Sequence, residues 1–175
     1  LGVDAIVAEG MEAGGHIGET TTMCLLPQIV DAVTIPIIAA GGIADGRAMK
    51  AVEILGAQGV QIGTLFLATE ECRIHENYKQ AVLNANDTDT AVTGRTLNSA
   101  VRCIKNDMTT KYLELEKSCS NREELEKLTI GSLKKAVFEG DIKNGSMMAG
   151  QICGKINEIK TVKQAIEDLM EEYGK

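Results

Sequence analysis

The sequence predicts an α/β fold built on parallel strands. Between Asp4 and Thr64, short apolar runs alternate with segments of helical spacing, and the connections between them are only a few residues long. Strands that alternate with helices in this way run parallel, because each helix carries the chain back to the start of the sheet. The 44% share of hydrophobic residues supports a folded domain with a substantial core.

The first predicted strand is the apolar run at residues 5–8. It ends at Glu9 and Gly10, and its uniform apolar character is typical of a strand buried on both faces. A helix is expected next, since apolar residues follow at helical spacing: Leu25, Leu26, Ile29, Val30 and Val33.

The second and third predicted strands lie at residues 36–40 and 59–62. Between them Asp45 is typical of a helix N-cap, and Gly56 is typical of the residue that ends a helix. The three strands and the helices between them are the basis for the α/β class.

The strand signal weakens further along the chain. Residues 75–85 are predicted to be helical with His75 on a solvated face, and residues 90–94 are one further candidate strand. From Asp107 onward the sequence predicts charged helices, with capping boxes at Asn121 and Thr161. The last helix is predicted to be amphipathic through Val162, Ala165, Ile166, Leu169 and Tyr173.

Composition excludes several classes of function. The net charge of −7 argues against nucleic acid or an anionic membrane as a partner, and 3% aromatic residues without Trp argue against a base-stacking platform. No apolar run is long enough to cross a bilayer, so we expect a cytoplasmic protein. Five cysteines without a C-x-x-C pair, and only two histidines, predict free thiols and no metal site.

Glycines follow the predicted strands at the end where parallel sheets bind ligands. Gly41, Gly42, Gly63 and Thr64 follow two adjacent strands, so their backbone N–H groups can approach one anion, and a following helix N-terminus would add positive charge. This pattern predicts a phosphate site like that of many (β/α)8 barrels. Turn geometry alone is the alternative reading. No G-x-G-x-x-G or P-loop motif is present.

His16 is the most informative single residue. Its glycine-rich loop follows a strand end and cannot easily be core, so we expect a catalytic or substrate-facing imidazole that exchanges a proton near neutral pH. A surface histidine is the alternative. Glu9 ends the first strand, where a carboxylate can bind a hydroxyl-bearing ligand such as a ribityl chain or can cap a loop.

Four segments together resemble the FMN-dependent enoyl-acyl-carrier-protein reductase II family, which belongs with the nitronate monooxygenases. They are residues 9–18, 38–46, 60–64 and 148–151. The resemblance implies that His16 is the active-site histidine and that Glu9 holds the ribityl hydroxyls. It also implies that Met148 and Gln151 line the flavin ring or the substrate mouth. The remaining implied FMN contacts are Gly14, Gly15, Gly41, Gly42, Gly63 and Thr64.

The same resemblance implies a reaction and its partners. NADH or NADPH would reduce FMN, and a trans-2-enoyl thioester on acyl-carrier protein would be reduced in fatty acid synthesis. Lys105, Lys111 and Lys117 are candidate contacts for that acidic carrier, and we expect a homodimer at full length. The alternatives are a nitronate monooxygenase that uses O2, a catalytically incomplete barrel fragment, and a phosphate-binding barrel such as a sugar-phosphate isomerase.

The resemblance covers the chain but not the whole family fold. It implies the carboxyl-terminal half of a (β/α)8 TIM barrel at residues 1–106 and a helical cap at residues 107–175. The chain opens at Leu1 inside an apolar pattern, which also suggests a fragment. Because half a barrel leaves sheet edges open, we expect this chain alone to bind FMN poorly and to have no turnover.

Overall fold

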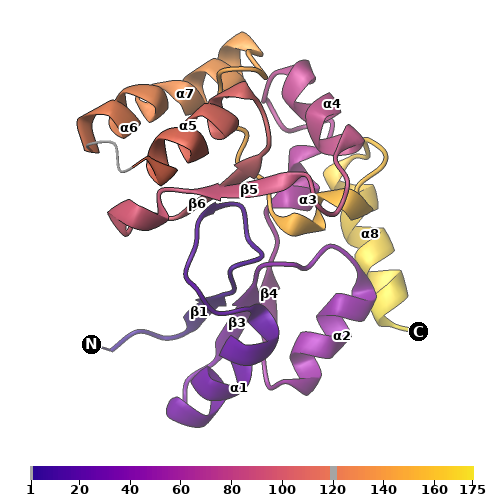
Figure 1. Cartoon of the computed structure of the whole chain (residues 1–175). Helices are drawn as coiled ribbons and strands as arrows, with labels where there is room; N and C mark the ends of the chain where they lie inside the picture. The colour runs from indigo at the N-terminus through magenta and orange to yellow at the C-terminus, as the bar shows by residue number, and fades with distance from the viewer. Residues whose placement is uncertain (1, 119–121) are drawn as a thin grey trace.

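The structure is a computed structural model that describes residues 2–118 and 122–175 (Figure 1). Within these residues the strands form two sheets of three strands each, and neither sheet closes into a barrel. No helix in the described ranges has the length and apolar character needed to cross a membrane.

The first sheet is parallel, as predicted. Its strand order is β1 (Ile6–Glu9), β3 (Ile37–Ala40) and β4 (Gly59–Gln61). The register pairs Glu9 with Ala40 and Ala40 with Gln61, so the strands end side by side. This confirms the α/β class and brings the residues after each strand to one edge. Among the described residues β1 and β4 each pair with β3 alone, so the barrel, of which the sequence predicts only one half, is not closed in this chain.

The expectation that the first strand is buried on both faces is wrong for this chain. Ala8 is buried, but Val7 is 46% exposed and Ile6 is only half-buried. Side chains alternate between the two faces of a strand, so Val7 lies on the face opposite Ala8, and this face is the more exposed one.

The second sheet is antiparallel and has the strand order β2 (Gly15–His16), β6 (Val101–Ile104) and β5 (Thr90–Thr93). The candidate strand at residues 90–94 is therefore present as β5. Its partner β6 was not predicted. Since β5 and β6 pair antiparallel, they do not continue the parallel sheet.

Two helices cover the parallel sheet, α1 (Thr22–Ala32) and α2 (Gly46–Ile54). Asp45 caps α2 as predicted, and Gly56 adopts a positive φ of +101° just after the helix. The core under these helices contains Ala8, Leu26, Ile37, Ala39, Ile43, Val52 and Ala57.

The remaining short helices lie around the second sheet and beside β4. Tyr78 and Val82 of α4 pack into a core with Met147 and Cys153, whereas Tyr112 of α5 packs against Leu125 of α6. The bounds of these elements are α3 Thr64–Leu67, α4 Glu76–Asn84, η1 Arg95–Leu97, α5 Asp107–Lys117, α6 Arg122–Thr129, α7 Ser132–Lys134, the π-helical η2 Lys135–Glu139 and the 3-10 turn η3 Gln151–Lys155. Instead of lying on a freely solvated helix face, His75 is half-buried and caps α4 by accepting a hydrogen bond from the Asn77 N–H.

The last helix, α8 (Val162–Tyr173), returns to the parallel sheet and packs against α2 (Figure 1). Its predicted capping box at Thr161 is present, whereas the one expected at Asn121 lies outside the described residues. Ala165 and Leu169 are buried as the amphipathic pattern predicts, but Ile166 is 45% exposed.

Candidate functional site

The ends of the three parallel strands enclose a cavity of about 280 Å3, named the glycine cavity below. All seven residues predicted to bind a cofactor line it, together with seven others. The full lining is Glu9, Ala13, Gly14, Gly15, Ala40, Gly41, Gly42, Ile43, Gln61, Gly63, Thr64, Leu67, Met148 and Ile152. The sheet register explains why these residues meet. The three parallel strands end side by side, so the residues that follow each strand lie at the same edge of the sheet.

Gly41 and Gly42 follow β3 with φ values of +94° and +75°, a conformation that favours glycine. A Cβ on Gly41 would lie 2.8 Å from the Gly10 carbonyl oxygen, so the loops after β1 and β3 approach each other too closely for any side chain. Thr22 fixes this approach, since its Oγ1 donates to the Gly41 carbonyl oxygen at 3.0 Å.

Gly63 and Thr64 follow β4. A Cβ on Gly63 would meet no atom within 4 Å, so space beside this glycine is open in the cavity. The Thr64 Oγ1 accepts a hydrogen bond from the Gly150 N–H at 2.9 Å, which ties β4 to the segment 148–151. As a hydroxyl, Thr64 still has a proton to donate to an anion.

The backbone donors of this cavity fit a phosphate. Among the turn, loop and cap hydrogen bonds of the described chain, none uses the N–H of Gly42, Gly63 or Thr64. Backbone N–H groups that line a cavity and donate no such hydrogen bond are suited to an anion with several acceptor oxygens.

Glu9 ends β1 and is half-buried at the cavity wall. Burial raises the pKa of its carboxyl above the ordinary value. A carboxylate in this position can accept hydrogen bonds from ligand hydroxyls.

The loop at residues 10–14 connects Glu9 to the second sheet. The Glu12 carboxylate accepts a hydrogen bond from the Thr22 N–H at 3.0 Å and thereby caps α1. A Cβ on Gly14 would lie 2.6 Å from the backbone of Ala149, and the Gln151 N–H donates to the Glu12 carbonyl oxygen at 2.9 Å. Gln151 therefore supports the loop through its backbone.

His16 lies in β2 next to Gly15, but its exposed side chain borders a different cavity of about 240 Å3, named the histidine cavity. Thr93, Val101, Cys103 and Tyr112 are among the other residues that line it. Met148 lines both cavities, so the two cavities share one wall residue. The family resemblance implied that Met148 lines the site, but the sequence did not predict a second cavity.

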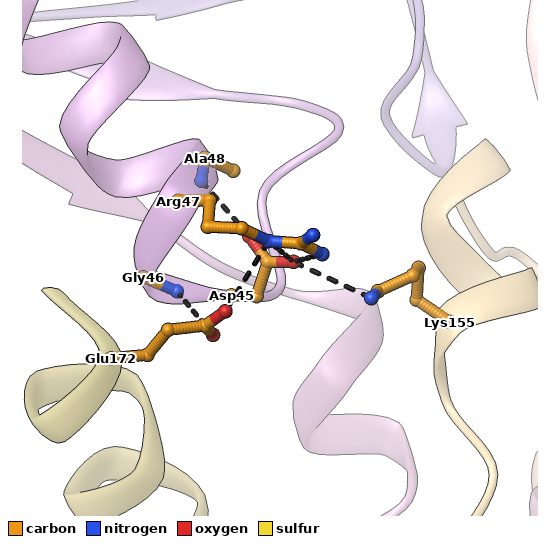
Figure 2. A network of polar contacts seen from close by, with 6 residues as sticks. All are labelled: Asp45, Gly46, Arg47, Ala48, Lys155 and Glu172. Atoms are coloured by element: carbon orange, nitrogen blue, oxygen red, sulfur yellow. Dashed lines mark hydrogen bonds and ion pairs between the residues drawn. The ribbon is translucent and has the colours of Figure 1, made fainter. Parts of the chain in front are cut away.

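The start of α2 has the Asp45 cap that the sequence predicts and a second carboxylate, Glu172, that the sequence does not predict. Figure 2 shows the residues around it, named the α2 cap network. The Asp45 carboxylate accepts from the Ala48 N–H at 2.9 Å, and the Glu172 carboxylate accepts from the Gly46 N–H at 3.1 Å. Two carboxylates therefore occupy two of the N–H donors at this helix end, so α2 does not present these donors to an anion.

Two cations complete the α2 cap network. Arg47 lies 2.5 Å from Asp45 and 3.3 Å from Glu172, and the Lys155 ammonium lies 3.5 Å from Asp45 (Figure 2). Burial alone would raise the pKa of Asp45, but the hydrogen bonds from Arg47 and Ala48 and the nearby cations hold it below its ordinary value. The network joins α2, η3 and α8.

The chain is similar to known proteins over nearly its whole length. A sequence model described as NMO, nitronate monooxygenase, matches residues 1–172. The chain is 40% identical to the curated "Probable nitronate monooxygenase" of Staphylococcus haemolyticus (strain JCSC1435), over 98% of this chain and 51% of that protein.

Two solved structures are similar across 99% of the chain. FabK from Thermotoga maritima is 48% identical, with a TM-score of 0.95 and 55% of its own chain covered. A nitroalkane oxidase from Streptomyces ansochromogenes is 30% identical, with a TM-score of 0.83 and 52% covered. The chain thus spans about half the length of the relatives it matches.

Proposed function

The chain belongs to the nitronate monooxygenase family of FMN-using flavin oxidoreductases, and we propose that its glycine cavity holds the phosphate end of FMN. The N–H groups of Gly41, Gly42, Gly63 and Thr64 would bind the phosphate oxygens. Convergence of these residues on one cavity at the strand ends is the observation that carries the proposal.

The other cavity residues fit the rest of the cofactor. Glu9 would accept hydrogen bonds from the ribityl hydroxyls, and the backbone of Gly14 and Gly15 would lie along the flavin. When bound, FMN would supply the hydride chemistry, with NADH or NADPH as the reductant. The protein residues would orient the cofactor and the substrate.

We propose a trans-2-enoyl thioester on acyl-carrier protein as the substrate, reduced in fatty acid synthesis. His16 would polarise the thioester carbonyl or hold the proton that the α-carbon receives. The histidine cavity beside it, partly lined by Val101, Cys103 and Met148, offers apolar surface to an acyl chain. The 48% identity to FabK across nearly the whole chain and the four sequence motifs support this choice.

Nitronate oxidation with O2 is the second candidate. It is supported by the name of the curated relative and by the similarity to nitroalkane oxidase. In that reaction His16 would act on the α-proton of the substrate.

An acidic carrier protein would need local basic residues, since the chain carries a net charge of −7. Lys111 and Lys117 are exposed on α5 and fit this role. Lys105 is exposed too, but its ammonium already donates to the Thr88 carbonyl oxygen at 2.6 Å.

The test uses the chain alone and a reconstituted complex, in which the chain is co-expressed with the part of Thermotoga maritima FabK that the match does not cover. We expect the chain alone to contain little FMN and the complex to be yellow. The complex should oxidise NADH or NADPH only when an enoyl thioester is added.

Three results would change the proposal. Oxidation of a nitronate without NADH would favour the second candidate, and flavin without either activity would leave a non-catalytic fragment. A complex that forms but binds no FMN would contradict the assignment of the glycine cavity.

A further inference from the structure

Arg102 is a buried cation whose role the proposed reaction does not explain. It lies in the middle of β6 with 4% of its surface exposed. Among the residues that the structure describes, no carboxylate forms an ion pair with it. Glu12, in the loop at residues 10–14, attracts the Arg102 charge from beyond ion-pair distance. A buried charge is unfavourable unless its hydrogen bonds are well satisfied.

The guanidinium of Arg102 donates two of its three hydrogen bonds to one carbonyl group. Its Nε and one terminal nitrogen donate to the Met11 carbonyl oxygen at 3.0 and 2.9 Å. The other terminal nitrogen donates to the Thr90 hydroxyl at 3.0 Å. Hydrogen bonds from a charged donor are stronger than neutral ones, and the pair fixes the direction of the carbonyl.

The Met11 carbonyl belongs to the loop at residues 10–14. This loop runs from the end of β1 up to the antiparallel sheet, as the indigo segment in Figure 1 shows. Residues of the proposed site flank the loop on both sides, because Glu9 precedes it and Gly15 and His16 follow it.

The strand that carries Arg102 also holds the far end of this loop. In the β2–β6 register Gly15 lies opposite Arg102 and His16 lies opposite Val101. The loop is thus attached to β6 at two points, by the backbone at Gly15 and by the guanidinium at Met11. Gly14, between these points, packs on the backbone of Ala149.

We propose that Arg102 is a positioning residue that sets the orientation of His16 and of the loop at residues 10–14 relative to the glycine cavity. It acts through the Met11 carbonyl and touches no substrate. A methionine in its place would fill similar space without a buried charge, so the particular contribution of the arginine is the paired hydrogen bond. This role rests on the proposed function of His16 and of the glycine cavity.

The test compares Arg102→Lys, which keeps the charge, and Arg102→Met, which keeps much of the volume, with the exposed Arg73→Gln as a matched control. The chain has two histidines, so imidazole NMR spectra of the full chain contain a His16 signal and a His75 signal. His75 caps α4 and reports on the fold away from β6.

We expect the His16 signal to shift and broaden in both Arg102 variants, while the His75 signal and the unfolding temperature of at least Arg102→Lys stay near the wild-type values. FMN affinity of the reconstituted complex should fall about tenfold in both, since a charge-assisted hydrogen-bond pair is lost. Arg73→Gln should change none of these quantities.

An unchanged His16 signal in a folded Arg102→Lys protein would overturn the proposal, since the β2–β6 backbone pairing would then suffice. Equal changes at His16 and His75 would also overturn it and indicate a general loss of structure. The NMR measurement needs neither flavin nor turnover. A complex without FMN binding would therefore contradict the proposed function and leave the result on Arg102 unaffected.

Discussion

The segment from the end of β3 into α2 contains two groups of backbone amides a few residues apart. One group faces a cavity, and the other donates to side-chain carboxylates. Gly41 and Gly42 face the glycine cavity, where the Gly42 N–H takes part in no turn, loop or cap hydrogen bond of the described chain. Gly46 and Ala48, at the start of α2, donate to the carboxylates of Glu172 and Asp45. The same stretch of sequence thus offers donors to a ligand on one side and closes a helix on the other.

This difference supports the proposal that the glycine cavity, and not the start of α2, binds the phosphate. A helix N-terminus attracts negative charge through its free N–H groups and its dipole. At the start of α2 two side-chain carboxylates already accept hydrogen bonds from these N–H groups and balance the helix dipole. A phosphate there would be repelled by both carboxylates. The glycine cavity is the side of the loop on which amide donors remain for a ligand.

The largest expected effect is that of Gly41→Ala. The alanine would need a positive φ and would place its Cβ 2.8 Å from the Gly10 carbonyl oxygen. We expect the free energy of unfolding to fall by about 1–3 kcal/mol from the backbone strain. FMN affinity of the reconstituted complex should fall by at least about tenfold, since each 1.4 kcal/mol of lost binding is about tenfold.

Urea denaturation and flavin fluorescence measure these two quantities for Gly41→Ala. Gly18→Ala is the control, because a Cβ there meets no atom within 4 Å and Gly18 does not border the cavity. Wild-type stability in Gly41→Ala would show that the two loops can separate without consequence.

Gly63→Ala should weaken FMN binding with little effect on stability. The new Cβ meets open space in the cavity, so unfolding should change by less than about 0.5 kcal/mol. The methyl group would occupy the space proposed for the phosphate, and we expect FMN to bind about tenfold more weakly. Riboflavin, which lacks the phosphate, should lose much less affinity, and an equal loss for both flavins would place the phosphate elsewhere.

Asp45→Ala should show the reverse behaviour. Loss of the N-cap of α2 should lower the free energy of unfolding by about 0.5–2 kcal/mol. FMN affinity of the complex should stay the same, since the α2 cap network lies outside the glycine cavity. A loss of affinity as large as that of Gly63→Ala would mean that the two regions are not separate.

The smallest expected effect is an opposite pH dependence of the two regions. The pKa of Asp45 is lowered in the folded state, so its contribution to stability is present above its ordinary value of 3.8 and is lost as the pH falls through the folded value. The pKa of Glu9 is raised, so its contribution is present below 4.5 and is lost as the pH rises through the folded value.

Thermal unfolding of Asp45→Ala and Glu9→Gln between pH 3 and pH 7 measures the direction of each pH dependence separately. The destabilisation by Asp45→Ala should shrink towards low pH, whereas Glu9→Gln should become more stable relative to wild type towards neutral pH. The same pH trend in both variants would contradict the assigned causes.

The parallel half of the fold follows from local sequence patterns. Apolar runs, the cap at Asp45 and the glycines after each strand were sufficient to predict three parallel strands and the residues that meet at their ends. These features depend on neighbours in the chain, and the parallel register then brings Gly41 and Gly63 to one cavity without further information.

The antiparallel sheet could not be predicted in the same way. In β6 the buried Arg102 interrupts the apolar pattern, so the strand resembles an exposed segment. The hydrogen-bond acceptor of the Arg102 guanidinium, the Met11 carbonyl oxygen, is 91 residues away in sequence. Likewise Glu172 reaches Gly46 across 126 residues, and no local spacing indicates that this carboxylate occupies the start of α2.

The most direct test of the phosphate assignment is a backbone amide NMR titration of the chain with FMN at concentrations high enough to overcome weak binding. We expect FMN to shift the signals of Gly41, Gly42, Gly63 and Thr64 together, and riboflavin to shift them much less. Movement of Gly46 and Ala48, with the four cavity amides unchanged, would contradict this assignment.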